Sequence, residues 1–286
     1  MGMLEYFEKT YAKYFVSLSD KEAYLKRIGL GSSDILITKE WLDRLQFAHM
    51  CSVPFENLDL YDYDGNVDFG TEEMFDKVVT RWRGGYCFEL NALFMSLLEA
   101  IGFEVYPVGV RIVMGMEGSS FVPTISHRAS IVTIGGKRYY TDVGFGMLTA
   151  PGASICIDDY GEQDVMGDIY TVRDRPYNNK MIVRHAGNGP TEMFMFSSDP
   201  FNVVDFIAFN VAIQIKGFRD KRIANLRTLH GSMSIDGDIF RRTENGRVTE
   251  TPLRSAEDAY RVLSNEYGMI LLRPLKDLAV KPEAQL

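Results

Sequence analysis

The stretch that decides the fold begins at residue 81 and reads Arg81-Trp-Arg-Gly-Gly-Tyr-Cys87-Phe-Glu-Leu-Asn91. Two adjacent glycines precede an aromatic residue and Cys87, and an apolar helix is predicted to begin at that cysteine and to end at Gly102. Between residues 88 and 101 apolar side chains fall on nearly every face, which is typical of a buried helix. The sequence therefore predicts a buried helix with a cysteine at its N-terminus.

Cys87 is a candidate nucleophile because of that position. Free backbone N–H groups and the positive end of the helix dipole favour a thiolate over a thiol. The glycines at 84 and 85 let a substrate approach the sulfur closely. The alternative is that Cys87 is a small buried hydrophobic residue, as most free cysteines are. Residues further along the chain favour the first interpretation.

Length and composition describe an ordinary soluble globular protein. The chain has 286 residues, of which 46% are hydrophobic and 24% charged, and this length indicates two or three domains. A net charge of −8 without a basic patch argues against nucleic-acid or membrane partners, and no apolar run reaches membrane length. Cys51, Cys87 and Cys156 are widely spaced and odd in number. We therefore expect a cytoplasmic protein with neither a disulfide framework nor a metal site.

Residues 1–103 are predicted to be mostly helical. Thr38 is a candidate N-cap of a helix that ends at His49, and we expect this histidine to be a polar helix end. Glu56 stands between apolar residues, where a carboxylate requires a partner, and Arg83 is the candidate partner. The alternative is a pair that is exposed to solvent.

After the helix the apolar period changes from about 3.6 to 2, which indicates strands. Residues 104–114 are predicted to form one strand, in which Pro107 requires a bulge or an edge. Residues 127–134 and 137–145 are predicted to form a hairpin, because Gly135-Gly136 between them is a strong turn signal.

The register of this hairpin predicts a histidine–carboxylate pair. If the two glycines are the central turn residues, Ile134 lies opposite Lys137 and Ala129 lies opposite Asp142. His127 and Asp142 then lie diagonally on one face, roughly 7–8 Å apart at Cα and within reach of a hydrogen bond. A slip of one residue would put them on opposite faces.

Cys87, His127 and Asp142 together make the set of groups used in acyl transfer. The thiol is the nucleophile, the histidine takes its proton, and the carboxylate orients the histidine. Backbone N–H groups at the helix start can hold an oxyanion. The alternative is coincidence among 4 histidines and 39 acidic residues. The chemistry indicates a cysteine acyl enzyme without naming the acyl donor.

Five motifs follow one another along the chain, namely Tyr24-Leu-Lys-Arg-Ile-Gly-Leu30, Val53-Pro-Phe-Glu-Asn-Leu58, Arg83-Gly-Gly-Tyr-Cys-Phe-Glu-Leu-Asn91, His127-Arg128 and Asp142-Val-Gly-Phe-Gly146. In this order they resemble the arylamine N-acetyltransferases over at least residues 20–150. The resemblance implies that the catalytic residues are Cys87, His127 and Asp142. It also implies that the acceptor pocket is lined by Phe55, Ile112 and Phe145, and that CoA approaches Gly146.

The same resemblance implies acetyl-CoA as donor, an aromatic amine or hydrazine as acceptor, and ping-pong transfer through an acetyl-cysteine. It implies an α+β multidomain fold with a triad arranged as in cysteine proteases. The expected parts are a helical bundle (1–103), a β-barrel (104–200), a connecting segment (201–214) and an α/β lid (215–286).

The C-terminal elements are predicted from their own patterns. We expect a helix and a strand within 199–210, although this segment lacks the more polar, serine-containing pattern usual in the family. Lid strands are predicted at 219–229, 231–239 and 246–252, and a helix at 255–267.

Other functions are compatible with parts of this pattern. An amide synthase that closes polyketide chains would use the same triad. A cysteine peptidase or a transglutaminase would use a triad of the same kind, but the five motifs are not characteristic of those enzymes. A non-enzymatic binding protein on a decayed scaffold is a third class, and the intact trio argues against it.

Overall fold

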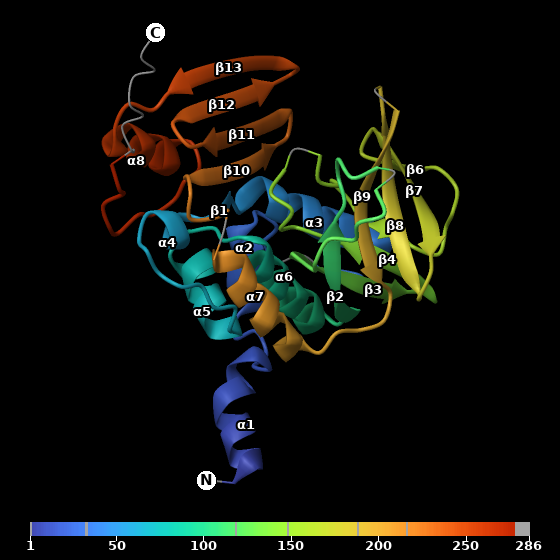
Figure 1. The fold of residues 1–286 in the computed structure, drawn as a ribbon. Coiled ribbons are helices and arrows are strands. Elements are labelled where there is room, and N and C mark those ends of the chain that lie inside the picture. The colour runs from blue at the N-terminus through green and yellow to red at the C-terminus, as the bar shows by residue number, and fades with distance from the viewer. Residues whose placement is uncertain are drawn as a thin grey trace.

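One long helix, α6 (Cys87–Ile101), lies at the centre of the molecule (Figure 1). The structure is a computed structural model that describes residues 2–31, 34–117, 119–147, 149–187, 189–215 and 217–277. All side chains from Cys87 to Leu98 are buried, and Gly102, with φ 112° in the left-handed region, ends the helix. The buried helix predicted from the sequence is confirmed.

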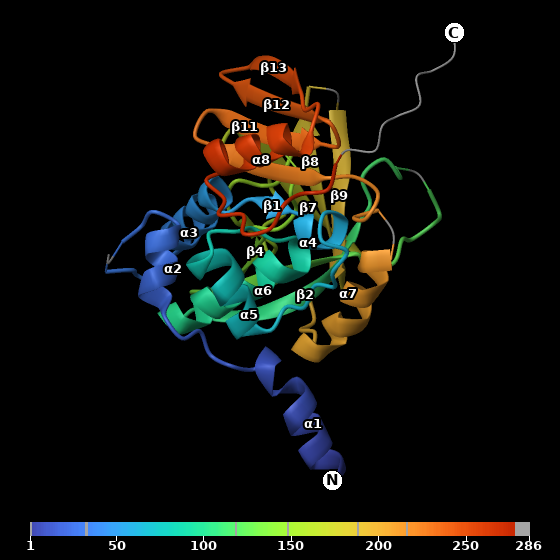
Figure 2. The ribbon, with the colours of Figure 1, turned by 90° about the vertical axis from the view of Figure 1, so that its left-hand side faces the viewer.

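The other N-terminal helices surround α6, except for the first, which extends away from the body of the molecule (Figures 1 and 2). Thr38 accepts a hydrogen bond from the Trp41 N–H (3.3 Å) and so caps its helix as predicted. In chain order these helices are α1 (Met3–Tyr11), α2 (Lys21–Arg27), α3 (Lys39–Ser52), α4 (Leu58–Tyr61) and α5 (Thr71–Phe75), followed by a π-helical turn (Asp76–Thr80).

His49 is fully buried within α3, so the prediction of a polar helix end is wrong. Its Nδ1 lies 2.8 Å from the Tyr24 hydroxyl, and its ring packs edge-on against Phe94 at 5.5 Å. Burial lowers the pKa of His49 to about 3, which keeps the ring neutral. His49 therefore joins α2, α3 and α6 as a core residue.

An eight-stranded antiparallel sheet packs against α6 through β2 and β3. Its spatial order is β5-β4-β3-β2-β9-β8-β7-β6. Gln163 joins the two edge strands, since its side-chain amide accepts from the Cys156 N–H and donates to the Cys156 carbonyl, both at 2.8 Å. The expected barrel is therefore a near-closed sheet. Its strands are β2 (Glu104–Ile112), β3 (His127–Ile134), β4 (Lys137–Thr141), β5 (Ile155–Cys156), β6 (Gln163–Val165), β7 (Asp168–Arg175), β8 (Asn179–Ala186) and β9 (Gly189–Ser197).

The hairpin of β3 and β4 has the predicted register. Ile134 pairs with Lys137 and Ser130 with Thr141. The second strand ends at Thr141, however, and does not continue to residue 145 as expected. The chain turns there because the Asp142 carboxylate accepts a hydrogen bond from the Gly144 N–H (2.9 Å), as in an Asx-turn.

Pro107 lies where β2 has a neighbouring strand on one side only. It pairs with Ser130 of β3, whereas β9 pairs with β2 only between Val110 and Ile112. The carbonyl of Pro107 accepts from the Phe201 N–H (2.9 Å) instead. The predicted edge position is confirmed, and the strand contains no bulge at this residue.

A second, five-stranded sheet forms the C-terminal part and lies at the end of the molecule opposite α1 (Figures 1 and 2). Its first strand comes from the N-terminal part, because Phe55 pairs with Asn225 and Glu56 with Ala224. This pairing was not predicted from the sequence. The spatial order is β1 (Phe55–Glu56), β10 (Ile223–Thr228), β11 (Gly231–Asp236), β12 (Ile239–Glu244) and β13 (Arg247–Pro252), with α8 (Ala256–Asn265) packed on the sheet through a separate core cluster.

The segment between the two sheets is helical, so the strand expected within 199–210 is absent. A 3-10 turn (Val203–Asp205) leads into α7 (Phe206–Ile215). Phe206, Asn210 and Gln214 are its buried residues, and this spacing of four is that of one helix face. The last residues of the expected lid, 278–286, lie outside the described ranges.

Candidate active site

The structure brings Cys87, His127 and Asp142 together in the core. Cys87 is the first residue of α6, His127 is the first residue of β3, and Asp142 follows the last residue of β4. His127 Nε2 lies 2.6 Å from Asp142 Oδ2, and the Cys87 side chain lies close enough to the histidine to raise its pKa. The diagonal pair predicted from the hairpin register is thus present.

The loop after β4 packs directly on the cysteine. A Cβ added to Gly144 would lie 2.9 Å from the Cys87 Cα, so only a glycine fits there without a shift of backbone. The sulfur itself lies 4.0 Å from the Ser126 carbonyl, next to His127 in the chain. Cys87 is only 4% exposed.

Four hydrogen bonds fix the Asp142 carboxylate. Oδ2 accepts from His127 Nε2 (2.6 Å) and the Tyr140 hydroxyl (2.9 Å), and Oδ1 accepts from Asn91 Nδ2 and the Gly144 N–H, both at 2.9 Å. Burial alone would raise the pKa of Asp142, but the charge of His127 and the hydrogen bonds from His127, Asn91 and the Gly144 N–H lower it below the ordinary value. The carboxylate therefore stays ionised although it is buried.

Sequence reasoning missed Asn91 and Tyr140, although the spacing contained a signal for both. Asn91 lies four residues after Cys87 and so on the same face of α6. Tyr140 lies two residues before Asp142 and so on the same side of the strand. A search for polar residues at these intervals would have found them.

The electrostatics favour a charged His127. Burial would lower its pKa, but the Asp142 carboxylate, the hydrogen bond with Asp142 and the Cys87 side chain raise it to about 10. The ring is held by aromatic neighbours, with Phe145 edge-on at 5.8 Å and Phe194 stacked at 6.3 Å. An imidazolium in this position can stabilise a thiolate on Cys87.

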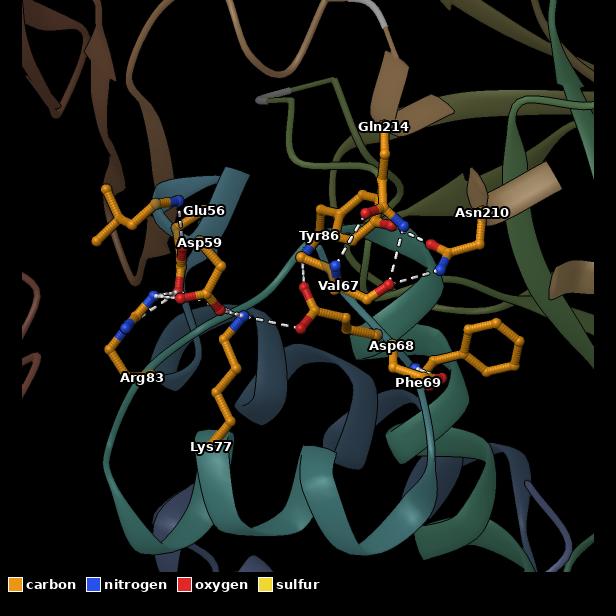
Figure 3. A network of polar contacts seen from close by, with 12 residues as sticks. Glu56, Asp59, Val67, Asp68, Phe69, Lys77, Arg83, Tyr86, Asn210 and Gln214 are labelled. Carbon is orange, nitrogen blue, oxygen red and sulfur yellow. Dashed lines mark hydrogen bonds and ion pairs between the residues drawn. The ribbon is translucent and has the colours of Figure 1, made fainter. Parts of the chain in front are cut away.

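The predicted pair of Arg83 and Glu56 is present and buried. Arg83 donates to Glu56 Oε1 through Nε (3.0 Å) and Nη2 (2.7 Å). Lys77 and Asp59 extend the pair into a cluster that the sequence did not predict, with Lys77 Nζ 2.5 Å from Asp59 Oδ2. Figure 3 shows both cations pointing toward the two acids.

The same cluster reaches the start of the cysteine helix. Lys77 donates to Glu89 Oε1 (2.7 Å), and Glu89 Oε2 accepts from the Tyr86 N–H (3.0 Å), so this carboxylate caps the first turn of α6. On the other side, the Tyr86 hydroxyl donates to Asn210 of α7, as Figure 3 shows. The residue before Cys87 is therefore held at its backbone and at its ring.

The residues implied as acceptor and CoA contacts lie in different surroundings. Phe145 packs against His127, and Ile112 pairs with Phe194 in the sheet. Phe55 lies on β1 and covers Gly146, whose added Cβ would come within 2.5 Å of the phenyl ring. Together these residues extend from the triad to the boundary between the two sheets.

A cavity of about 370 Å³ opens beside the site, between α3, the loop after β4 and the C-terminal sheet. Its lining includes Phe55, Val143, Gly146 and Arg227. Val143 and Gly146 of this lining belong to the same loop as Gly144, which packs on Cys87. Within the described ranges, no cluster of three His, Cys, Asp or Glu residues could hold a metal ion. In the same part of the chain, no helix combines the length and the apolar character needed to span a membrane.

Comparisons with known proteins point to one family. The profile of a family described as N-acetyltransferase matches residues 38–275. Arylamine N-acetyltransferase 1 of Homo sapiens is 28% identical over 280 residues, which cover 90% of this chain and 96% of that enzyme. The solved structure of arylamine N-acetyltransferase from M. tuberculosis superposes with a TM-score of 0.79 at 25% identity, over 87% of this chain and 94% of that one.

A third relative bears on the donor. The arylamine N-acetyltransferase of Mycobacterium marinum, solved in complex with CoA, superposes with a TM-score of 0.78 at 25% identity, over 87% of this chain and 93% of that one. The profile match spans most of the chain, and the relatives are aligned over nearly their whole length. The chain therefore belongs to the arylamine N-acetyltransferase family of acyltransferases.

Proposed function

We propose that the protein transfers an acetyl group from acetyl-CoA to the nitrogen of an aromatic amine or hydrazine, through an acetyl group carried on Cys87. The observation that carries the proposal is the hydrogen-bonded pair of His127 and Asp142 beside Cys87, which begins a buried helix. Family membership supports the choice of donor and acceptor.

In the first half-reaction, the Cys87 thiolate attacks the carbonyl carbon of the acetyl thioester. N–H groups of the first turn of α6 stabilise the oxyanion. The bond between the carbonyl carbon and the CoA sulfur then breaks, and the His127 imidazolium supplies the proton that CoA takes as it leaves. The product is acetyl-Cys87 with a neutral His127.

In the second half-reaction, the amine nitrogen attacks the acetyl carbon. Neutral His127 removes the proton from the attacking nitrogen, and the bond to the Cys87 sulfur breaks. The thiolate and the imidazolium are restored, and the N-acetylated product leaves. Asp142 keeps the imidazole in one orientation throughout, through the 2.6 Å contact with Nε2.

Aromatic side chains favour an aromatic acceptor. Phe145 lies against His127, and Phe55 lies on the cavity beside the site. We assign these two residues and Ile112 to the acceptor pocket, and Gly146 to the path of CoA. The C-terminal sheet and α8 would act as the lid over the near-closed sheet, in a cytoplasmic enzyme.

The test is intact-protein mass spectrometry after mixing with acetyl-CoA and no amine. We expect one added acetyl group, located on Cys87 by peptide mapping, together with release of one equivalent of free CoA. Subsequent addition of p-anisidine should remove the acetyl group. If CoA is released only when the amine is present, the ping-pong mechanism is wrong.

Two controls separate the alternatives. Cys87→Ser should take up no stable acetyl group, whereas Cys51→Ser should behave like the wild type. Peptide hydrolysis without acetylation would support a cysteine peptidase instead.

A further inference from the structure

Tyr140 donates a hydrogen bond to the Asp142 carboxylate, and the proposed reaction gives this hydroxyl no role. It lies on β4 between its ladder partners Ile131 and Ile155, and its side chain is 1% exposed. Its ring stacks on Phe194 (centroids 5.7 Å apart, interplanar angle 21°). The ring also packs against Phe196 at 5.0 Å, and its hydroxyl donates to Asp142 Oδ2 at 2.9 Å.

The hydroxyl shares that oxygen with the catalytic histidine. An ionised carboxylate offers about four lone-pair sites. Asn91 and the Gly144 N–H occupy the two sites on Oδ1, while His127 and Tyr140 occupy the two on Oδ2. Each donor disperses part of the negative charge, so the Tyr140 bond weakens the pull of Asp142 on the imidazolium.

We propose that Tyr140 is a positioning residue of the triad, which holds the Asp142 carboxylate toward His127 and limits how strongly that carboxylate stabilises the imidazolium. The proposal rests on the proposed function, because it concerns the proton that His127 gives and takes between the two half-reactions. Acetyl transfer to the amine needs neutral His127. A carboxylate with fewer donors would keep His127 protonated up to a higher pH.

In these surroundings the Tyr140 hydroxyl stays protonated and acts as a hydrogen-bond donor to Asp142. Burial, together with the charge and the hydrogen bond of Asp142, raises the pKa of Tyr140 well above its ordinary value, so it keeps its proton throughout the working range. The titratable groups that face His127 are Cys87 from α6 and Asp142 from the loop after β4. The strands beside it contribute uncharged residues, Val110 from β2 and Phe194 from β9.

The test compares Tyr140→Phe with Tyr139→Phe. The first removes only the hydroxyl and keeps the stacked ring. The second is a matched control, because successive residues of a strand point to opposite faces and Tyr139 therefore faces away from Asp142. For each protein, the acetyl-enzyme is formed first, and its transfer to p-anisidine is then measured as a function of pH.

Transfer should slow on acidification in both proteins, but in Tyr140→Phe this fall should begin about one pH unit higher. Below that pH, Tyr140→Phe should therefore transfer the acetyl group roughly tenfold more slowly than the wild type. Well above that pH, transfer should match the wild type within about twofold. Tyr139→Phe should follow the wild-type profile. A loss by one common factor at every pH would reduce Tyr140 to a packing residue, and an unchanged profile would show that its hydroxyl does not act on the triad.

A second perturbation has the opposite expected sign and does not depend on the stability of Tyr140→Phe. 3-Fluorotyrosine at position 140 keeps the shape but donates a stronger hydrogen bond, so the fall in transfer should move to lower pH. A shift in the same direction as Tyr140→Phe would overturn the proposal.

A direct readout separates this proposal from the proposed function. In protein whose Cys87 has been alkylated, ¹⁵N NMR of the His127 ring follows its titration without any acetyl transfer. Removal of the Tyr140 hydroxyl should move that titration upward by a similar amount. If the wild type forms no acetyl-enzyme but this shift is present, the proposed function fails and the role of Tyr140 stands.

Discussion

Cys87 and His127 form the smallest unit on which the proposed activity depends. Because the Asp142 carboxylate raises the pKa of His127 to about 10, the imidazolium persists through neutral pH. That charge and the start of α6 both place positive potential beside the Cys87 sulfur. We therefore expect iodoacetamide to alkylate the resting protein rapidly well below neutral pH.

Peptide mapping after this reaction should find the label on Cys87. Cys51 is an internal control, because burial raises its pKa to about 11 and leaves it a thiol. Asp142→Asn should slow the reaction at low pH, since the imidazolium loses its anionic partner. A rate that rises like that of an ordinary thiol, near pH 8.5, and is unchanged by His127→Ala would show that no ion pair exists.

Phe145 is the residue on which acceptor choice is expected to depend. It packs edge-on against His127 and against Phe194, at 5.8 and 4.7 Å between ring centroids. Phe145→Ala should change the relative kcat/KM of amines of different bulk and leave the acetylation of Cys87 nearly unchanged. If every amine loses activity by one factor, Phe145 only packs the core. Stopped-flow release of CoA, measured beside the steady-state rates, distinguishes the two outcomes.

At the scale of elements, the sequence predicted what depends on local pattern. The buried helix at Cys87 and the Gly135-Gly136 hairpin follow from apolar periodicity and turn chemistry, and both have the expected form. The pairing of β1 with β10 could not be predicted, because a strand of two residues has no periodicity and its partner lies far along the chain.

Buried polar residues were the harder part of the candidate site to predict. His49 looked like a polar helix end because nothing in its own segment reveals that Tyr24 supplies a partner from another helix. Lys77 was missed for the same reason, since its partners Asp59 and Glu89 come from separate segments. The partners of a buried charge become visible only when the elements are placed in space.

The charge cluster beside the cysteine loop gives a stability prediction for its elements. Glu56→Ala removes the acceptor of two Arg83 hydrogen bonds and leaves a guanidinium that is 8% exposed without its main partner. Loss of one member of a buried pair typically costs about 3–5 kcal/mol, although Asp59 remains near the guanidinium at 3.3 Å. Urea unfolding should therefore show a markedly lower midpoint.

The surface pair Arg241–Glu250 provides the matched control, with side chains 42% and 52% exposed. Glu250→Ala should change the free energy of unfolding by less than about 1 kcal/mol. A cost below about 0.5 kcal/mol for Glu56→Ala would contradict the prediction and show that Asp59 and water satisfy Arg83 equally well.

At the scale of the whole molecule, backbone pairing and buried polar contacts join the C-terminal sheet to the N-terminal part. The backbone pairing is the β1–β10 ladder, and one of the polar contacts is the buried pair of Asp62 and Arg222. Phe218, just before β10, adds a contact with the rings of Phe55 and Tyr86, next to the cysteine. Cys87 is only 4% exposed, and we expect movement of this part to widen the path of acetyl-CoA to the sulfur.

The Asp62–Arg222 pair tests whether this part opens by itself. Both side chains are fully buried, and Asp62 also accepts from the Lys276 N–H (3.0 Å). Asp62→Asn leaves the Arg222 charge without its anionic partner, at a cost of about 3–5 kcal/mol, so amide hydrogens in β10–β12 should exchange roughly a hundredfold faster or more. The amides of β3 and α6 should keep their protection, because their core is a separate cluster.

The control is Asp236→Asn, which breaks the exposed ion pair between Asp236 of β11 and Lys221. It should leave all exchange rates unchanged. Equal acceleration in β3 and β11 would mean that the molecule unfolds as one unit, and acetyl-CoA would then have to enter by side-chain movement alone.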